Sequence, residues 1–224
     1  MRDQLDLTAY ARERRSGATR VLIARTDAEA EPALREHWSG KRRIGITPCA
    51  PDLTYAYLSC PTADARGCAI PVDIESWQRA FPAIAGFFER MPSAFGTTRH
   101  AYPHAVVRSW SRGRAALIGD AAHALPPTLA QGAGLAIANG YALARILETE
   151  RDVPTALALW EKQFRAIADQ TQRWSIRLDV LTTRWPHPLR HLRRAILWSI
   201  GRSNRLNRRI RVADRVRLVG ADFR

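Results

Sequence analysis

One passage of the sequence, residues 114–139, holds the residues whose types and order could do chemistry. Its apolar residues 115–118 predict a buried strand that ends in Gly119 and Asp120. A carboxylate at the end of a strand can accept hydrogen bonds from sugar-like hydroxyl groups. Pro126 and Pro127 follow and predict a rigid turn, because the proline ring restricts the backbone. The passage therefore predicts a binding site beside Asp120.

The same passage continues into a helix whose first turn is rich in glycine. Gly132, Ala133 and Gly134 let another molecule approach the bare backbone there. The first amides of a helix have no partner inside it, and the helix dipole adds partial positive charge. An electron-rich group would be stabilised at this point. His123, by itself, is either a structural side chain, which we favour, or a catalytic base.

Each feature is weak alone, but their order, G-D-A-A-H-x-x-P-P-x-x-x-Q-G after an apolar strand, is specific. It resembles the FAD-dependent aromatic hydroxylases of the para-hydroxybenzoate hydroxylase type. The resemblance implies that the aspartate binds the ribityl hydroxyls of FAD and that the second proline lies beside the isoalloxazine ring and the substrate. It also implies that the amides of the helix start face the pyrimidine edge of the ring. The implied cofactor-binding residues are Gly119, Asp120, Pro127, Gly132, Ala133 and Gly134.

The resemblance covers roughly residues 1–175. Residues 40–48 and 55–59 are similar to the middle sheet that covers the substrate in this family, and residues 2–6 look like the segment after its Asp-Gly fingerprint. Arg108 is a weaker candidate for the site, and Asn139 stands where many relatives have an acidic residue. No GxGxxG fingerprint follows a strand in the 224 residues. We therefore expect this chain to hold one part of the FAD site and to be a poor flavoenzyme alone.

The implied activity is hydroxylation of a small aromatic or quinone-like substrate with NAD(P)H and oxygen. We identify no catalytic side chain and no metal ligand. A complementary N-terminal FAD-binding chain is one partner that this reading leaves open. The alternative is a decayed, non-catalytic relative that acts as a binding module. We do not expect nucleic-acid binding, because no zinc-finger, helix-turn-helix or RNP-like signature accompanies the arginines.

The remaining pattern predicts an α+β fold: an antiparallel substrate-covering sheet, the C-terminal strand–helix part of an FAD-binding α/β domain, and a helical tail. The expected domains are residues 1–110, 111–150 and 151–224. We expect strands at 19–25, 101–110 and 115–118, the last within a parallel sheet, and a hairpin of 42–47 with 53–59 that carries aromatic side chains on one face. Helices are expected near 73–88, with Pro82 starting a new one, at 134–147 and after Val153, with a break at 185–188.

The composition is that of a globular protein with an unusual charge. The net charge is +14, and 33 of the 35 basic residues are arginine. The start of the chain has no apolar signal-peptide core, so we expect a cytoplasmic protein. Cys49, Cys60 and Cys68 lack CxxC spacing, so free thiols fit better than a disulfide framework or a zinc site. Residues 189–200 form an apolar helical stripe with basic flanks, which suits docking on the protein, our preference, or peripheral contact with an anionic membrane.

Overall fold

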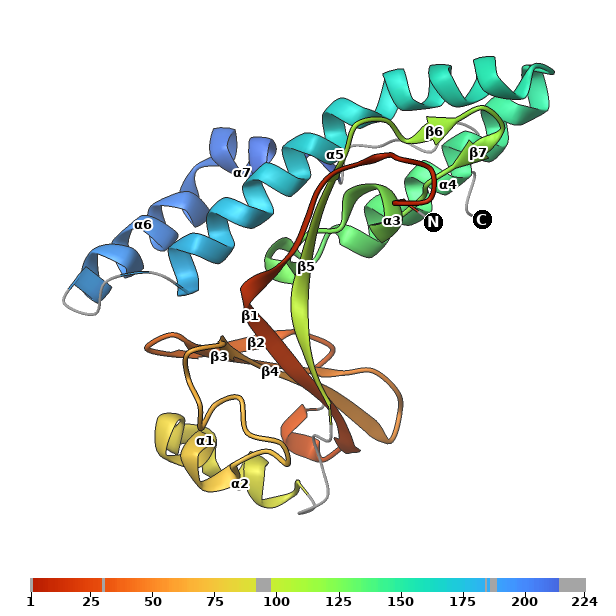
Figure 1. Cartoon of the computed structure of the whole chain (residues 1–224). Coiled ribbons are helices and arrows are strands. Elements are labelled where there is room, and N and C mark those ends of the chain that lie inside the picture. Colours follow the sequence, from red (N-terminus) through yellow and green to blue (C-terminus); the bar gives the residue numbers. More distant parts are fainter. Residues whose placement is uncertain (1, 30, 92–97, 184, 186–188, 214–224) are drawn as a thin grey trace. The chain divides into compact units, whose positions relative to one another are not determined.

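The chain divides into two compact units in the computed structural model. Unit 1 contains Met1–Glu13, Pro103–Leu181 and His191–Arg224, and unit 2 contains Arg14–Tyr102 and Thr182–Arg190. The structure describes residues 2–29, 31–91, 98–183, 185 and 189–213. Both strands and helices are present (Figure 1), so the predicted α+β class is confirmed.

A five-stranded sheet in the order β2-β3-β4-β1-β5 forms most of unit 2, and only the first residues of β1 and the last residues of β5 belong to unit 1. The predicted hairpin is confirmed, because β3 and β4 pair antiparallel with Ile44 opposite Leu58 and Ile46 opposite Ala56. The first strand is longer than predicted, because its exposed first half is polar and shows no apolar alternation. The strands are β1 (Thr8–Ala24), β2 (Arg35–Ser39), β3 (Arg42–Pro48), β4 (Leu53–Pro61) and β5 (Arg99–Val107).

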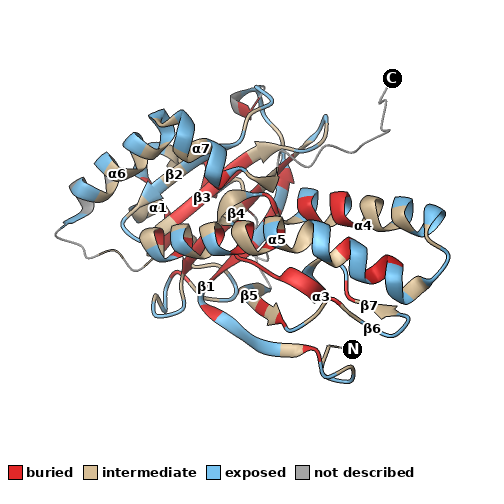
Figure 2. Ribbon diagram, turned by 90° about the horizontal axis from the view of Figure 1, so that it is seen from above, coloured by how far each residue is buried: buried red, intermediate tan, exposed pale blue. Residues whose placement is uncertain are grey.

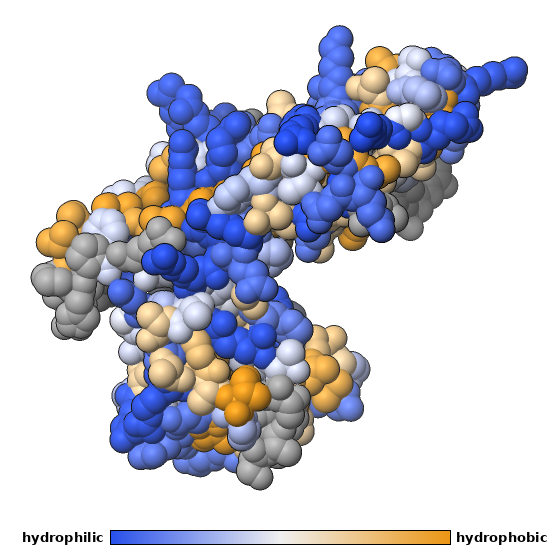
Figure 3. Space-filling view, viewed as in Figure 1, coloured by the Kyte–Doolittle hydropathy of each residue, from blue (hydrophilic) through white to orange (hydrophobic). Residues whose placement is uncertain are grey.

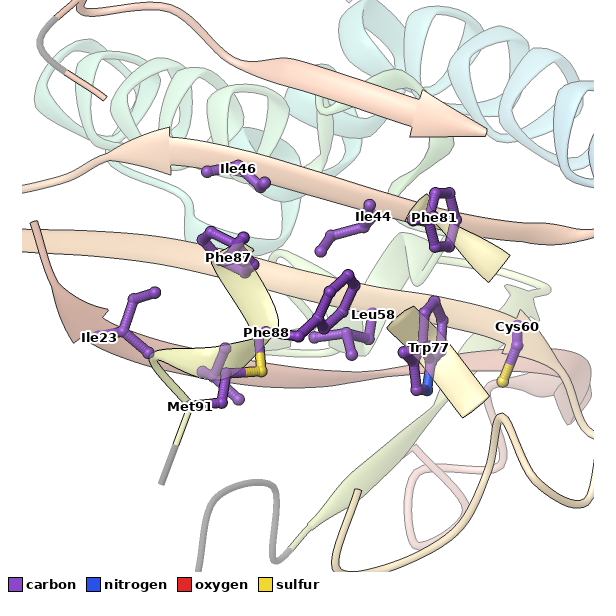
Figure 4. Packing of buried hydrophobic residues seen from close by; sticks show 12 residues of the cluster. Ile23, Ile44, Ile46, Leu58, Cys60, Trp77, Phe81, Phe87, Phe88 and Met91 are labelled. Atoms are coloured by element: carbon purple, nitrogen blue, oxygen red, sulfur yellow. The ribbon is translucent and has the colours of Figure 1, made fainter. Parts of the chain in front are cut away.

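Short helices cover one face of this sheet and enclose the core of unit 2. They are η1 (Asp27–Glu29), α1 (Ile74–Ala80), η2 (Pro82–Ile84) and α2 (Ala85–Glu89). As predicted, Pro82 starts a new helical turn. Trp77 stacks on Phe81 with ring centroids 5.8 Å apart, and Phe88 is completely buried. Figure 4 shows these rings facing Ile44 and Leu58 of the sheet. Burying an aromatic side chain of this size contributes about 2–3 kcal/mol.

Unit 1 is mainly helical. Its elements are β6 (Ser111–Arg112), β7 (Ala115–Ala116), α3 (Asp120–His123), η3 (Pro127–Leu129), α4 (Gly132–Thr149), α5 (Val153–Thr183), α6 (Arg190–Arg202) and α7 (Asn204–Ile210). Helices α4 and α5 lie side by side, and α4 carries buried residues on one side and exposed residues on the other (Figure 2). The core packs Leu135 of α4 and Trp160 of α5 against Trp110 and Leu117.

The strand predicted at residues 115–118 is shorter than expected. Only Ala115–Ala116 is a strand, and it pairs antiparallel with Ser111–Arg112 across a turn at Gly113, whose φ is +59°. The next amide, of Leu117, donates to the Trp110 carbonyl at 2.7 Å. An apolar run this short does not reveal whether its ladder is parallel or antiparallel.

The basic C-terminal region continues as helices, as predicted. Helix α5 ends at Thr183 and α6 begins at Arg190; most of the predicted break, including both prolines, lies outside the described residues. In α7, Ile210 is buried, and Gln170 of α5 donates to the Arg209 carbonyl at 2.9 Å. Leu192 and Trp198 of α6 are exposed. Hydrophilic side chains cover much of the face drawn in Figure 3, and none of the described helices is long and apolar enough to cross a bilayer.

Candidate functional site

The candidate site begins at the turn that joins β7 to α3. Gly119 has φ +55° and ψ −136°, a conformation that glycine adopts far more readily than other residues. Its carbonyl accepts from the amides of Ala122 and His123 at 3.0 and 2.9 Å and so starts α3. The strand-to-helix reversal leaves Asp120 exposed. Gly119 also lies close to α4, since a Cβ added to it would be 3.5 Å from the Cβ of Ala136.

Helix α5 holds the proline turn in place. Pro126 is buried and extended, whereas Pro127 is exposed and starts η3. The Ser175 hydroxyl donates to the Pro126 carbonyl, and the Thr128 hydroxyl donates to the Ser175 carbonyl at 2.7 Å. Gln172 donates from one amide nitrogen to the carbonyls of Ala105 at 2.8 Å and Ala124 at 2.9 Å. These bonds fix the turn that presents Pro127.

The first turn of α4 is open. Gln131 is the residue before the helix, and its side chain accepts no hydrogen bond from the first amides of α4. Ala133 and Gly134 are exposed, and a Cβ added to Gly134 would meet no atom within 4 Å. The side chain of Gln131 is buried, and its Oε1 has no hydrogen-bond partner in the described structure. This turn therefore offers amide donors to a ligand and room for it to approach.

His123 lies in the core beneath the site. It is 2% exposed, packs against Trp110 with ring centroids 5.6 Å apart, and its Nε2 lies 3.2 Å from Nδ2 of the fully buried Asn139. The carbonyl of Asn139 accepts from Trp160 Nε1 at 2.9 Å. Burial lowers the pKa of His123, because the charged imidazolium loses its hydration. A neutral His123 joins α3 to α4, which fits the structural interpretation.

Arg108, the weaker candidate, lies at the surface and pairs with Asp6, Nη1 to Oδ1, at 3.0 Å.

Sequence reasoning missed the residues of α5 that support the site. Arg165 donates to the carbonyls of Arg108 at 2.8 Å and Val107 at 2.5 Å, and Glu161 accepts from the Trp110 amide at 2.9 Å. The supporting residues recur at helical spacing on one side of α5, and this polar stripe was the available signal: Glu161, Arg165, Gln172 and Ser175.

In unit 2, the sheet face opposite the core carries aromatic rings. Tyr55 and Tyr57 of β4 lie with ring centroids 6.4 Å apart. The buried Arg43 guanidinium lies over the rings of Trp38 and Tyr57, at 5.3 and 5.5 Å. A Cβ on Gly45 would be 2.2 Å from the Tyr57 ring, so the ring lies directly over this glycine. The prediction that aromatic side chains line one face of the hairpin agrees with this arrangement.

Known proteins are similar to this chain in sequence and in fold. The profile of the family described as "FAD binding domain" matches residues 1–175. A probable 2-heptyl-3-hydroxy-4(1H)-quinolone synthase of Rhodococcus erythropolis is 35% identical over 186 residues, which is 81% of this chain and 48% of that protein. The solved structure of 2-methyl-3-hydroxypyridine-5-carboxylic acid oxygenase superposes with a TM-score of 0.74 at 30% identity, over 96% of this chain and 56% of that one.

The fold also matches a more distant structure, Klebsiella pneumoniae HpxO complexed with FAD and uric acid, with a TM-score of 0.74 at 18% identity over 95% of this chain and 55% of that chain. The chain belongs to the FAD binding domain family, among the flavoprotein monooxygenases of the aromatic-hydroxylase type. It spans about half the length of the curated relatives that it matches.

Proposed function

We propose that this chain supplies the ribityl- and ring-binding part of the FAD site of a monooxygenase that hydroxylates a small aromatic or quinone-like substrate. The observation that carries the proposal is the open first turn of α4 next to the Gly119 turn. Asp120 would accept hydrogen bonds from the ribityl hydroxyls, and Pro127 would lie along the ring. The amides of Ala133 and Gly134 would donate to the electron-rich edge of the ring.

The residues fit a flavin in both shape and charge. The exposed Asp120 carboxylate is an acceptor for hydroxyl groups, and the uncapped helix start attracts negative charge. The glycine at position 134 leaves this approach unobstructed. The flavin would supply the redox chemistry that activates oxygen, with electrons from NAD(P)H. The protein would orient the flavin and exclude water around it.

The aromatic sheet face of unit 2 is the surface that we propose for the substrate. Tyr55 and Tyr57 offer ring faces against which a flat aromatic molecule can stack. The quinolone synthases and the pyridine-carboxylate oxygenase among the relatives are named for flat heteroaromatic compounds. These names support an aromatic substrate for this chain without selecting one.

The GxGxxG part of an FAD site is not among these 224 residues, so we propose that a complementary FAD-binding segment completes the site. The test co-expresses the chain with the other half of the Rhodococcus relative and records a visible spectrum. Flavin absorption that co-purifies with both segments supports the proposal. A colourless complex with no FAD binding contradicts it and favours a non-catalytic binding module.

Asp120→Ala tests the role of the carboxylate in the same assembly. Loss of a charge-assisted hydrogen bond should weaken FAD binding by about 1.5–3 kcal/mol, as measured by fluorescence titration. Glu148→Ala is the matched control, because Glu148 is an exposed carboxylate at the far end of α4. Equal FAD affinity in both variants would remove Asp120 from the site.

A further inference from the structure

Two of the three cysteines lie in contact in unit 2. The Sγ atoms of Cys60 and Cys68 are 3.5 Å apart. Cys60 lies near the end of β4, and Cys68 lies in the loop that leads from β4 to α1. The third cysteine, Cys49, is exposed. The contact joins two residues that no motif in the sequence connects, and the proposed function uses neither of them.

The two thiols have different surroundings. Cys60 is 1% exposed and lies at the edge of the core beside Trp77 (Figure 4). Burial and the hydrogen bond to Cys68 raise the pKa of the Cys60 thiol to about 12. Cys68 is half-buried, and its thiol donates to the Pro61 carbonyl at 3.3 Å. An oxidant in solution therefore reaches Cys68 first, and Cys60 lies behind it as the second thiol.

The loop between the cysteines is already folded into the shape that keeps them together. The amide of Cys68 donates to the Asp64 carbonyl at 2.9 Å, and the amide of Gly67 donates to the Asp64 carboxylate at 2.9 Å. Arg42 of β3 donates to both oxygens of that carboxylate, at 2.6 and 2.8 Å. Such a two-point ion pair is directional and holds the loop against the sheet. Because this loop is already ordered in the folded chain, it loses little further conformational entropy when the two sulfurs are joined.

We propose that Cys60 and Cys68 are a reversible oxidation site that takes a hydroperoxide as its oxidant. The Cys68 sulfur attacks one peroxide oxygen and the O–O bond breaks, which gives a sulfenic acid and releases water from hydrogen peroxide or an alcohol from an organic hydroperoxide. The Cys60 sulfur then displaces the sulfenic hydroxyl, which leaves as water with the Cys60 proton. With hydrogen peroxide the balance is two thiols and one peroxide to one disulfide and two waters. A dithiol reductant reverses the step by thiol–disulfide exchange.

The disulfide would fix one wall of a hollow in unit 2. Pro61, Ala63 and Asp64 lie between the cysteines and line a hollow of about 470 Å³ together with Lys41 and Arg42. A disulfide between Cys60 and Cys68 would join the two ends of this segment covalently. The oxidised chain should therefore resist urea better in unit 2 than the reduced chain.

The test treats the purified chain with hydrogen peroxide, counts free thiols and maps peptides before and after dithiothreitol. Trypsin can cut after the exposed Arg66, which lies between the two cysteines. A Cys60–Cys68 disulfide therefore keeps the two resulting peptides joined until reduction. Because one of these peptides also contains Cys49, the mapping is done in Cys49→Ser, which should behave as the wild type does.

The wild-type thiol count should fall by two within one molecule, and dithiothreitol should restore it. Cys68→Ser, which leaves the core residue in place, should instead lose only single thiols and form no joined peptide. The proposal is overturned if Cys60 and Cys68 stay reduced while Cys49 is oxidised, or if the only disulfides are between two molecules. It is also overturned if Cys68→Ser loses two thiols within one molecule as the wild type does.

Discussion

Gly134 allows the cofactor proposal to be separated from simple helix packing. A Cβ at this position meets no atom within 4 Å, so Gly134→Ala introduces no clash and buries no new surface. The remaining effect is on the backbone, since alanine is favoured over glycine in a helix by about 0.5–1 kcal/mol. The variant should therefore unfold at a temperature roughly 1–4 °C higher than the wild type when no flavin is bound.

The same methyl group should harm flavin binding. It projects from the first turn of α4, where the ring edge would approach the amides. We expect FAD affinity in the co-expressed assembly to fall by at least about tenfold, which is about 1.4 kcal/mol. Thermal melts and fluorescence titrations together measure the two opposite effects.

Gly140→Ala is the matched control for Gly134→Ala. Gly140 lies in the same helix, and its Cβ would also meet nothing within 4 Å. It should gain similar stability and leave FAD affinity unchanged. If Gly134→Ala destabilises the chain, or if both variants bind FAD equally well, the reasoning about the first turn is wrong.

Three further predictions concern pH and packing. Hydrogen bonds from Arg42 lower the pKa of Asp64, so wild-type unfolding free energy should fall as pH drops below about 4; Asp64→Asn should be less stable near neutrality, with a flatter pH profile in urea titrations. Burial lowers the pKa of His123, so the neutral side chain contributes fully to the unfolding free energy above about pH 6.5, and the unfolding free energy should fall as the pH drops below that value. The variant His123→Gln should show no such fall. Gly45→Val should displace the Tyr57 ring and cost about 1–3 kcal/mol in urea unfolding, whereas an unchanged midpoint would show that the ring moves freely.

The sequence predicted the elements whose pattern is local. The β3–β4 hairpin has apolar alternation and turn-forming residues between its strands, and α4 has one apolar face, so both were found. The first half of β1 was missed because most of its residues are exposed and polar, which hides a strand. The strand at residues 115–118 was predicted too long, because the apolar run continues past Ala116 to Ile118.

In the candidate site too, the sequence predicted the local features and missed the contacts between residues far apart in the chain. The Gly-Asp turn and the glycine-rich helix start are visible in the sequence because their residues are close together. Gln172 and Ser175, which hold the proline turn, are more than forty residues away from the groups that they bind. Contacts at such separation depend on how α5 packs, so only the polar stripe along that helix could have suggested them.

The paired indole rings in unit 1 have an optical consequence. Trp110 and Trp160 are buried with centroids 4.8 Å apart and planes inclined at 53°, a fixed oblique geometry in which the transitions of two chromophores couple. Near-ultraviolet circular dichroism depends on such fixed aromatic packing and disappears when packing loosens. In unit 2, Trp77 stacks almost parallel to Phe81, at 7°, and should contribute a different band. The chain thus carries a separate intrinsic spectroscopic probe in each unit.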